Sequence, residues 1–525
     1  MKDVANNYTR RVNITLLTLF VVAMGIFFIV TPKYNDDIWH LKGWGEWFER
    51  NGAEIPSDGV NVFTAKIPAD KVWESIKVHL DKDRVRLSNA IGFLFLLPPK
   101  WIGSTIAFLF WLVTVWCVFK LSFTRYDDTL LLALAMAMWV FIFPWYEYMG
   151  CIMLQFNYLV PSGLMIMLLV WLRHGGRTGW SAAFLAAYTF IAGLFHEGFT
   201  VSVLGSLIII GIFYKECRTR RIWLVVGALA LALAIQLHPG GPIYKMTTDA
   251  GLGSTMRMYL MRTLTHVPSI WIALCVSAAY IWRKGFRRFV SNPFYCFCWV
   301  SEFLGIILAM MAREPRGAWW GDVCVLMMIL HMARQVVHLK AVWRYVLAAL
   351  LLVPTFFELI MLDIYTFRFA SEYRRIYRQY RIKPGEPYFT SLIASPWESW
   401  YMAPTVSQNW TFYYMRTPEL YGLPWSGNEM KIIPDDLRRV NEHSGSLLQG
   451  DMGIRKVGRH LVAPAGAETP VVQNVTADFG VRHFEGLVFC IPFKSESDGK
   501  IYYYIDFPWR EFEKNLFDIK GVWLK

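Results

Sequence analysis

Two adjacent carboxylates, Asp36 and Asp37, follow the first long apolar run of the chain. A positioned carboxylate can take a proton from a hydroxyl group and act as a general base. Neighbouring side chains point about 100° apart on a helix and oppositely on a strand, so only one of the two faces a cleft directly. Tyr34 and Trp39 frame the pair, and Tyr and Trp favour membrane–water interfaces. The pair is therefore a candidate catalytic site at a bilayer surface; the alternative is a helix cap or a solvated loop.

A second candidate is the stretch "GLFHEGF", which contains His196 and Glu197. It is not a zinc-protease motif, because no second His follows at the required spacing. Ionisable groups at a membrane boundary are costly to bury, which favours a cleft where Glu197 orients an acceptor or binds a cation. We expect Glu147 and Asn157 nearby on the same face. The alternative is a capped helix end with a hydrogen-bonded His.

Cationic side chains form the third candidate. Arg313 and Arg316 flank Glu314 and Pro315. A guanidinium fork binds phosphate in a bidentate manner, so these arginines are candidate phosphate ligands. The alternative is an ion-paired loop. Further candidates for the same role are Arg84, Arg86, His238 and Lys245.

The elements that must position these residues are apolar helices. Of the 525 residues, 55% are hydrophobic and only 18% are charged, against about 25% charged in soluble domains. About eleven runs are long enough to cross a bilayer: 13–31, 101–122, 128–146, 157–173, 180–196, 199–214, 222–238, 266–282, 294–312, 319–338 and 343–364. Residues 87–97 form a shorter apolar piece, which we interpret as re-entrant or interfacial. The eight cysteines fall mostly in these runs and are interpreted as small buried hydrophobes.

The charges give the orientation. The net charge is +13, and most basic residues lie in every second short loop, all on one side of the predicted spans, as in "KECRTRR" at 215–221 and "RKGFRR" at 283–288. Such loops face the cytoplasm. This distribution explains the charge without nucleic acid, and the chain has no ATP-binding motif. It places the N-terminus inside and all three candidate sites outside. We interpret the first apolar run as a retained helix.

The chain changes character after residue 365. Residues 366–384 predict an amphipathic interfacial helix. Residues 385–525 are mixed and contain strand-like runs such as "GLVFCIPF" and "KIYYYIDF". We therefore predict an all-α polytopic membrane domain at 1–365, with its first external loop at 32–100, and a small external β-containing domain at 385–525.

The ordered set of short motifs resembles the GT-C superfamily of membrane glycosyltransferases, and within it a poorly characterised bacterial group. The motifs are "NDDIW", "RLSN" at 86–89, "NYLVPSG" at 157–163, His-Glu at 196–197, "HPGG" at 238–241 and "REPRG" at 313–317. In layout the resemblance covers residues 1–380. The group usually has Pro-Gly-Asn followed by Arg, whereas this chain has Pro-Gly-Gly and then Lys245.

The resemblance implies a GT-C-like fold and an inverting transfer from a polyprenyl-phosphate-linked sugar. The acceptor would be a glycan, a lipid or a protein. Asp36 would be the base, and Asp37 would position the acceptor or steady the loop, on the periplasmic face of a bacterial inner membrane. An acidic pair can bind a divalent cation, but two carboxylates are too few to define a metal site.

Two other functions remain open from the sequence. A transporter or flippase for lipid-linked saccharides would place charged residues at mid-membrane. A polysaccharide polymerase or ligase outside the GT-C fold would have external Arg and His without the acidic pair in the first loop. The clustering of ionisable residues on one face favours the glycosyltransferase.

The charge distribution makes a direct prediction about topology. A reporter enzyme that works only outside the cytoplasm, fused after residue 380, should be active. A reporter that works only inside should be silent at the same position. The opposite pair of results would mean that the three candidate sites do not share the external face.

Overall fold

The protein is described by a computed structural model. It describes residues 2–32, 37, 73, 77, 86–96, 98–122, 128–143, 150–174, 182–237, 269–312, 315–382, 386–390, 432–450, 453–458, 460–464, 472–478, 483–506 and 520–524. The chain divides into two compact units. The first comprises Met1–Thr31 with Asp58–Asp363, and the second comprises Pro32–Ser57 with Ile364–Lys525.

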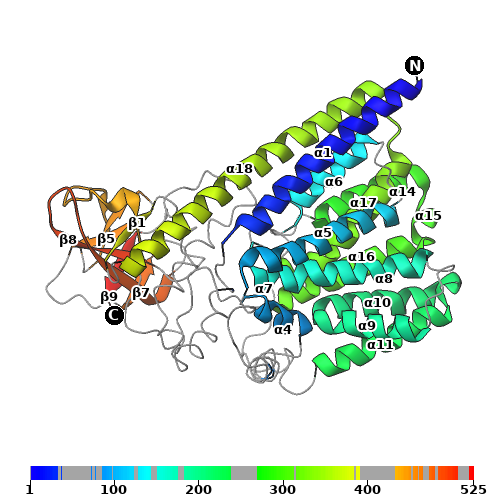
Figure 1. The fold of residues 1–525 in the computed structure, drawn as a ribbon, viewed down its shortest axis with the longest axis horizontal. Helices are drawn as coiled ribbons and strands as arrows, with labels where there is room; N and C mark the ends of the chain where they lie inside the picture. The colour runs from blue at the N-terminus through cyan, green and yellow to red at the C-terminus, as the bar shows by residue number, and fades with distance from the viewer. Residues whose placement is uncertain are drawn as a thin grey trace. The chain divides into compact units, whose positions relative to one another are not determined.

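The first unit is helical (Figure 1). Its longer elements are α1 Lys2–Val30, α5 Lys100–Ser122, α6 Thr129–Phe141, α8 Val160–His174, α9 Ala182–Phe195, α10 Glu197–Phe213, α11 Arg220–Gln236, α14 Ser269–Lys284, α16 Pro293–Ala312 and α17 Trp319–Val336. Helix α18 Ala341–Ile382 belongs to the first unit up to Asp363 and to the second from Ile364. Shorter elements are α4 Leu87–Leu94, α7 Ile152–Leu154, the π-helix Gln155–Leu159, the 3₁₀-helix Lys215–Cys217, α15 Phe286–Val290 and the 3₁₀-helix Pro315–Ala318. Each of the eleven predicted apolar segments therefore contains a helix.

Five stretches of helix among the described residues are long and apolar enough to cross a membrane. They are Thr9–Val30, Lys100–Ser122, Ile152–His174, Pro293–Met310 and Ala341–Glu372. Three shorter apolar helices are Thr129–Phe141, Ala182–Phe195 and Glu197–Phe213. The chain is a multi-pass membrane protein, and the number of eleven spans stays a prediction.

Helix α18 differs from the sequence-based expectation. We expected a span at 343–364 and a separate interfacial helix at 366–384, but one helix runs from Ala341 to Ile382. Pro354 lies inside it. The change from apolar to basic composition near residue 365 marks a change in the surroundings of the helix, not its end. No Gly or Pro between 355 and 382 stops the helix there.

Aromatic packing holds the first helices together. Trp111 of α5 is buried, and its ring centroid lies 5.8 Å from that of Phe20 and 5.9 Å from that of Phe28, both on α1. The Trp139 ring of α6 meets it edge-on at 5.7 Å. Large buried rings contribute much of the packing energy of a core, so Trp111 joins α1, α5 and α6.

Helix α17 is the most enclosed helix of the described part of the first unit. Nearly all of its residues are buried, and it packs against α5, α6, α14 and α16. The ring of its first residue, Trp319, packs tilted against that of Phe143 with centroids 4.6 Å apart, and its indole N–H donates a 3.0 Å hydrogen bond to the Ser162 hydroxyl. Asp322, in the first turn of α17, is consequently shielded from both water and lipid.

The second unit contains the predicted β-structure. A seven-stranded antiparallel sheet has the order β3-β4-β5-β8-β7-β6-β9. The strands are β3 Ser446–Leu447, β4 Arg455–Val457, β5 His460–Pro464, β6 Val472–Asp478, β7 His483–Lys494, β8 Ile501–Asp506 and β9 Gly521–Leu524, and a separate parallel pair is formed by β1 Tyr388–Thr390 and β2 Ile432–Pro434. The two strand-like runs of the sequence are β7 and β8, which pair with Cys490 opposite Ile505.

A small apolar core supports this sheet. It includes Ile433, Val462, Phe493, Tyr502 and Tyr504, all buried. Tyr502 and Tyr504 point to this core while Tyr503 between them does not belong to it, as the two-residue period of a strand requires.

The contact between α5 and α8 generates a stability prediction. A Cβ on Gly163 would lie 2.9 Å from the Phe110 carbonyl oxygen and 2.7 Å from its ring. Gly163→Ala should therefore lower the free energy of unfolding by about 1–3 kcal/mol. Gly227 of α11 is the matched control, because nothing lies within 4 Å of its Cβ position.

Gly227→Ala should leave stability unchanged or raise it by up to about 1 kcal/mol, because Ala favours a helix over Gly. Thermal unfolding of both variants in detergent measures the difference. Equal midpoints would show that α5 and α8 do not approach this closely.

Candidate functional site

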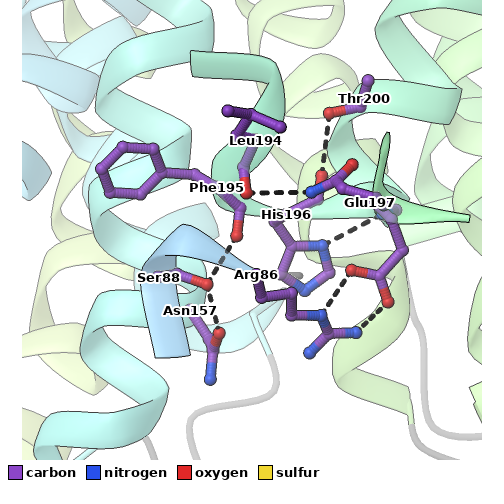
Figure 2. A network of polar contacts seen from close by, with 10 residues as sticks. Arg86, Ser88, Asn157, Leu194, Phe195, His196, Glu197 and Thr200 are labelled. Atoms are coloured by element: carbon purple, nitrogen blue, oxygen red, sulfur yellow. Dashed lines mark hydrogen bonds and ion pairs between the residues drawn. The ribbon is translucent and has the colours of Figure 1, made fainter. Parts of the chain in front are cut away.

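Two of the predicted motifs meet in an ion pair. Arg86, which precedes α4, and Glu197, the first residue of α10, form a bidentate salt bridge through Nε and one terminal nitrogen of the guanidinium (Figure 2). The two side chains are only 17% and 13% exposed. Fork-to-fork pairing is the strongest common arrangement of these groups, so it fixes the start of α4 against the start of α10.

His196 makes the turn between α9 and α10. It is the only residue between Phe195 and Glu197, and its extended backbone ends one helix and starts the next. Its Nδ1 accepts a 3.1 Å hydrogen bond from the Gly198 backbone N–H, which caps α10. The neutral ring then carries its proton on Nε2. Thr200 supports the turn by donating to the carbonyl oxygens of Gly193 and His196.

The electrostatics of Glu197 follow from this placement. The residue precedes the predicted span at 199–214. Burial by itself raises the pKa of the Glu197 carboxyl, but the charge and hydrogen bonds of Arg86 outweigh burial and hold that pKa far below its ordinary value. Glu197 is therefore a permanent anion, which suits holding a cation or orienting a guanidinium better than accepting a proton.

Ser88 and Asn157 add a neutral polar contact beside the ion pair (Figure 2). The Ser88 hydroxyl lies 2.6 Å from Asn157 Oδ1 and 2.5 Å from the Phe195 carbonyl oxygen. Asn157 sits in the π-helix Gln155–Leu159, where the Val160 N–H donates to the Gln155 carbonyl five residues back. Such single π-turns occur often at functional sites. Ser88 thereby joins α4, the end of α9 and the π-turn.

Aromatic rings surround His196. The Tyr158 ring centroid lies 5.2 Å from the imidazole, and that of Phe199 lies 4.7 Å from it. Trp319 packs 6.1 Å from Tyr158, and Trp320 packs 5.6 Å from Phe199. The aromatic wall lowers the local dielectric, which strengthens the adjacent ion pair.

Lys100 anchors the chain where the first loop begins. It is buried at the start of α5, and its ammonium donates to the carbonyl oxygens of Thr31 and Gly150. Thr31 directly follows α1 and lies five residues before Asp36. The ammonium thus ties the departure of the loop to α5 and to the segment before α7.

No family model, characterised protein or solved structure matches this chain. The assignment of a function therefore depends on the chemistry of the chain itself.

The predicted site residues fall into two groups. Arg86, Asn157, His196 and Glu197 come together from three sequence motifs, although Arg86 was expected at a phosphate and Glu197 at an acceptor or cation, and the structure pairs them with each other. Asp37 is fully buried in the second unit. Arg316 is described only in its backbone, in the 3₁₀-helix Pro315–Ala318. The predicted residues outside the described part are Tyr34, Asp36, Trp39, Arg84, Glu147, His238, Lys245 and Arg313.

Metal binding has no support within the described ranges. They contain no group of three or more His, Cys, Asp and Glu side chains that could hold a metal ion. Asp36 lies outside these ranges, so the divalent cation suggested for the first loop is untested.

Sequence reasoning missed Ser88 and Lys100 as parts of this site. Ser88 was inside a quoted motif, but its partners Asn157 and Phe195 are 69 and 107 residues away. Lys100 follows Pro98-Pro99 at the start of an apolar run. A positive charge at the N-terminus of a helix is disfavoured by the helix dipole. The position of Lys100 was therefore the feature of the sequence that could have identified it.

A second polar cluster lies inside the helices and was not anticipated. Glu302 of α16 and Asp322 of α17 are completely buried, and the Ser269 hydroxyl of α14 donates a 3.0 Å hydrogen bond to Glu302. The sequence showed each acid as an isolated charge in or beside an apolar run.

The ion pair at Arg86 leads to a stability prediction. Arg86→Ala leaves the Glu197 carboxylate buried without its partner and should cost about 2–4 kcal/mol of unfolding free energy. Arg86→Met combined with Glu197→Leu removes both charges and should recover most of that loss. Lys500→Ala is the control, since it removes an exposed ion pair with Glu442 and should change stability little.

Denaturant titration of the purified protein in detergent provides the comparison. A double variant as unstable as Arg86→Ala would show that packing, and not charge pairing, holds α4 against α10.

Proposed function

We propose that this protein is a membrane glycosyltransferase that uses a sugar carried on a polyprenyl phosphate. The observation that supports it best is the meeting of Arg86, Asn157, His196 and Glu197, from three motifs of the predicted external face, in one aromatic-lined cluster. A cluster that served only to cap helices would not need a bidentate guanidinium pair with a permanent anion. The multi-pass helices would give a lipid-linked donor access from the bilayer.

In this proposal the first loop supplies the base. Asp36 takes the proton from the acceptor hydroxyl while that oxygen bonds to the anomeric carbon. The bond from the anomeric carbon to the phosphate oxygen breaks, and polyprenyl phosphate leaves, so the configuration inverts. Asp37 positions the acceptor. The Lys100 clamp supports this role, because it fixes the chain at Thr31, where the loop begins.

Arginine side chains stabilise the leaving group. Glu197 holds the Arg86 guanidinium in a defined plane using two of its five N–H groups. A guanidinium so oriented is prepared for the negative charge that develops on the phosphate. Arg313 and Arg316 act with it, and Arg84, His238 and Lys245 are further phosphate ligands of the proposal.

The base is tested directly by transfer from a panel of polyprenyl-phosphate monosaccharides to cell-envelope glycans and glycolipids. Asp36→Asn should slow the release of polyprenyl phosphate about 10²–10⁴-fold, because the amide keeps the shape and loses the basicity. Asp435→Asn is the matched control, since Asp435 and Asp436 form another adjacent acidic pair, in the 3₁₀-helix Asp435–Leu437.

Asp435→Asn should transfer sugar at the normal rate. If Asp37→Asn transfers sugar slowly while Asp36→Asn transfers it at the normal rate, Asp37 and not Asp36 is the base. Normal rates in both would exclude the proposed mechanism.

A specific observation favours a second candidate, a transporter or flippase for lipid-linked saccharides. Glu302 and Asp322 lie within the predicted spans at 294–312 and 319–338 and are fully buried. Buried acids inside membrane helices are typical of transport proteins. Reconstituted vesicles separate the two functions: a transferase forms a new glycosidic bond, whereas a flippase moves the intact donor to the other leaflet.

A further inference from the structure

The strongest feature that the proposed reaction does not use is the pair of buried acids Glu302 and Asp322, which interact electrostatically. Helices α16 and α17 approach each other closely at Gly321. A Cβ on that glycine would lie 2.9 Å from the Glu302 Cα, and the Glu302 carboxylate occupies the space where this Cβ would be. Because Gly321 has no side chain, the Glu302 carboxyl can lie against the α17 backbone there. Gly321 directly precedes Asp322 in the sequence.

The carboxyl oxygens in this contact lack hydrogen-bond donors. Both oxygens of Asp322 and the Oε2 atom of Glu302 are buried and have no hydrogen-bond partner among the described residues. Ser269 at the start of α14 donates to the other Glu302 oxygen, at 3.0 Å. Buried polar atoms normally have partners, so three unsatisfied oxygens in one place indicate that something positive binds there.

The low dielectric around the two acids requires that a positively charged ligand neutralise them. Two carboxylates side by side in a low dielectric repel each other, and each loses its hydration. Arginine or lysine would normally neutralise such a pair, and Arg86 does so for Glu197. Neither acid of this contact forms a salt bridge with any of the described cationic side chains.

We propose that Glu302 and Asp322 form a proton-binding carboxyl pair inside the membrane domain, in which the Ser269 hydroxyl donates a hydrogen bond to Glu302. The protons come from water, and each carboxylate becomes a neutral carboxylic acid by forming one O–H bond. A metal cation would need about six oxygen ligands, while a proton needs only one or two. This proposal does not depend on the transferase reaction.

The titratable surroundings of the pair are simple. Within the described chain the only groups that interact electrostatically with either acid are the other acid and Ser269. The titratable residues nearest in sequence on the same helices are Cys298 on α16, Cys324 on α17 and Cys275 on α14. Helix α10 packs against α16 and begins at Glu197, which is paired with Arg86. The residue before this helix, His196, is also titratable.

Proton binding would be coupled to helix packing. Because Gly321 brings α16 and α17 together at this point, two ionised carboxylates would place like charges between the helices. Stability from the pair is present while the protons are bound and is lost as the pH rises and they leave. The interface of α14, α16 and α17 would then loosen at alkaline pH.

Infrared difference spectroscopy of the full chain in lipid nanodiscs tests the proposal. At neutral pH the wild type should show the carbonyl stretch of a protonated carboxylic acid. That band should weaken in Glu302→Gln and in Asp322→Asn and weaken further in the double variant. Glu358→Gln is the matched control, a buried glutamate of α18 whose removal should leave the band in place.

Thermal unfolding of the same samples against pH provides a second readout. The wild-type midpoint should fall toward alkaline pH, and this fall should be absent in the double variant. Replacing sodium by choline should have no effect. An unchanged band in the double variant would overturn the proposal, and so would a wild-type midpoint that depends on sodium and not on pH.

Discussion

Every polar group placed among apolar helices must find a partner in the protein, because neither lipid nor a packed core supplies one. The described helices meet this constraint in three ways. Arg86 and Glu197 neutralise each other, Lys100 is held by backbone carbonyl oxygens, and Ser88 bridges an amide and a carbonyl. Glu302 Oε2 and both Asp322 oxygens meet it in none of these ways. The first three contacts organise one end of α4, α5 and α10, and the buried acids are the site that we propose for protons.

The sequence predicted the helices well, because apolar runs of membrane length have few other structures available. The strands β7 and β8 were also evident from their composition. The break in α18 was predicted wrongly, because the composition changes near residue 365 while the backbone continues as a helix. A change of surroundings is not a stop signal unless a Gly or Pro accompanies it.

The site was predictable as a set of residues but not as a set of contacts. The positions of Arg86, Asn157, His196 and Glu197 on one face followed from the order of the predicted spans. Their pairing did not, because Arg86 meets Glu197 across 111 residues and sequence spacing carries no information at that range. Glu302 and Asp322 were invisible for the same reason, since each acid alone is unremarkable in an apolar run and only helix packing at Gly321 brings them together.

The π-turn at Gln155–Leu159 has a further consequence for how this membrane segment is built. A π-turn accommodates one more residue than an α-turn, so the chain before it is rotated by about 100° relative to an uninterrupted helix. Asn157 lies in the turn itself, while Val160–His174 keeps the regular faces of a spanning helix. The direction in which Asn157 faces Ser88 is thereby independent of the direction in which Val160–His174 faces the neighbouring helices. One extra residue lets the polar end and the buried shaft of the same segment be fitted to their surroundings separately.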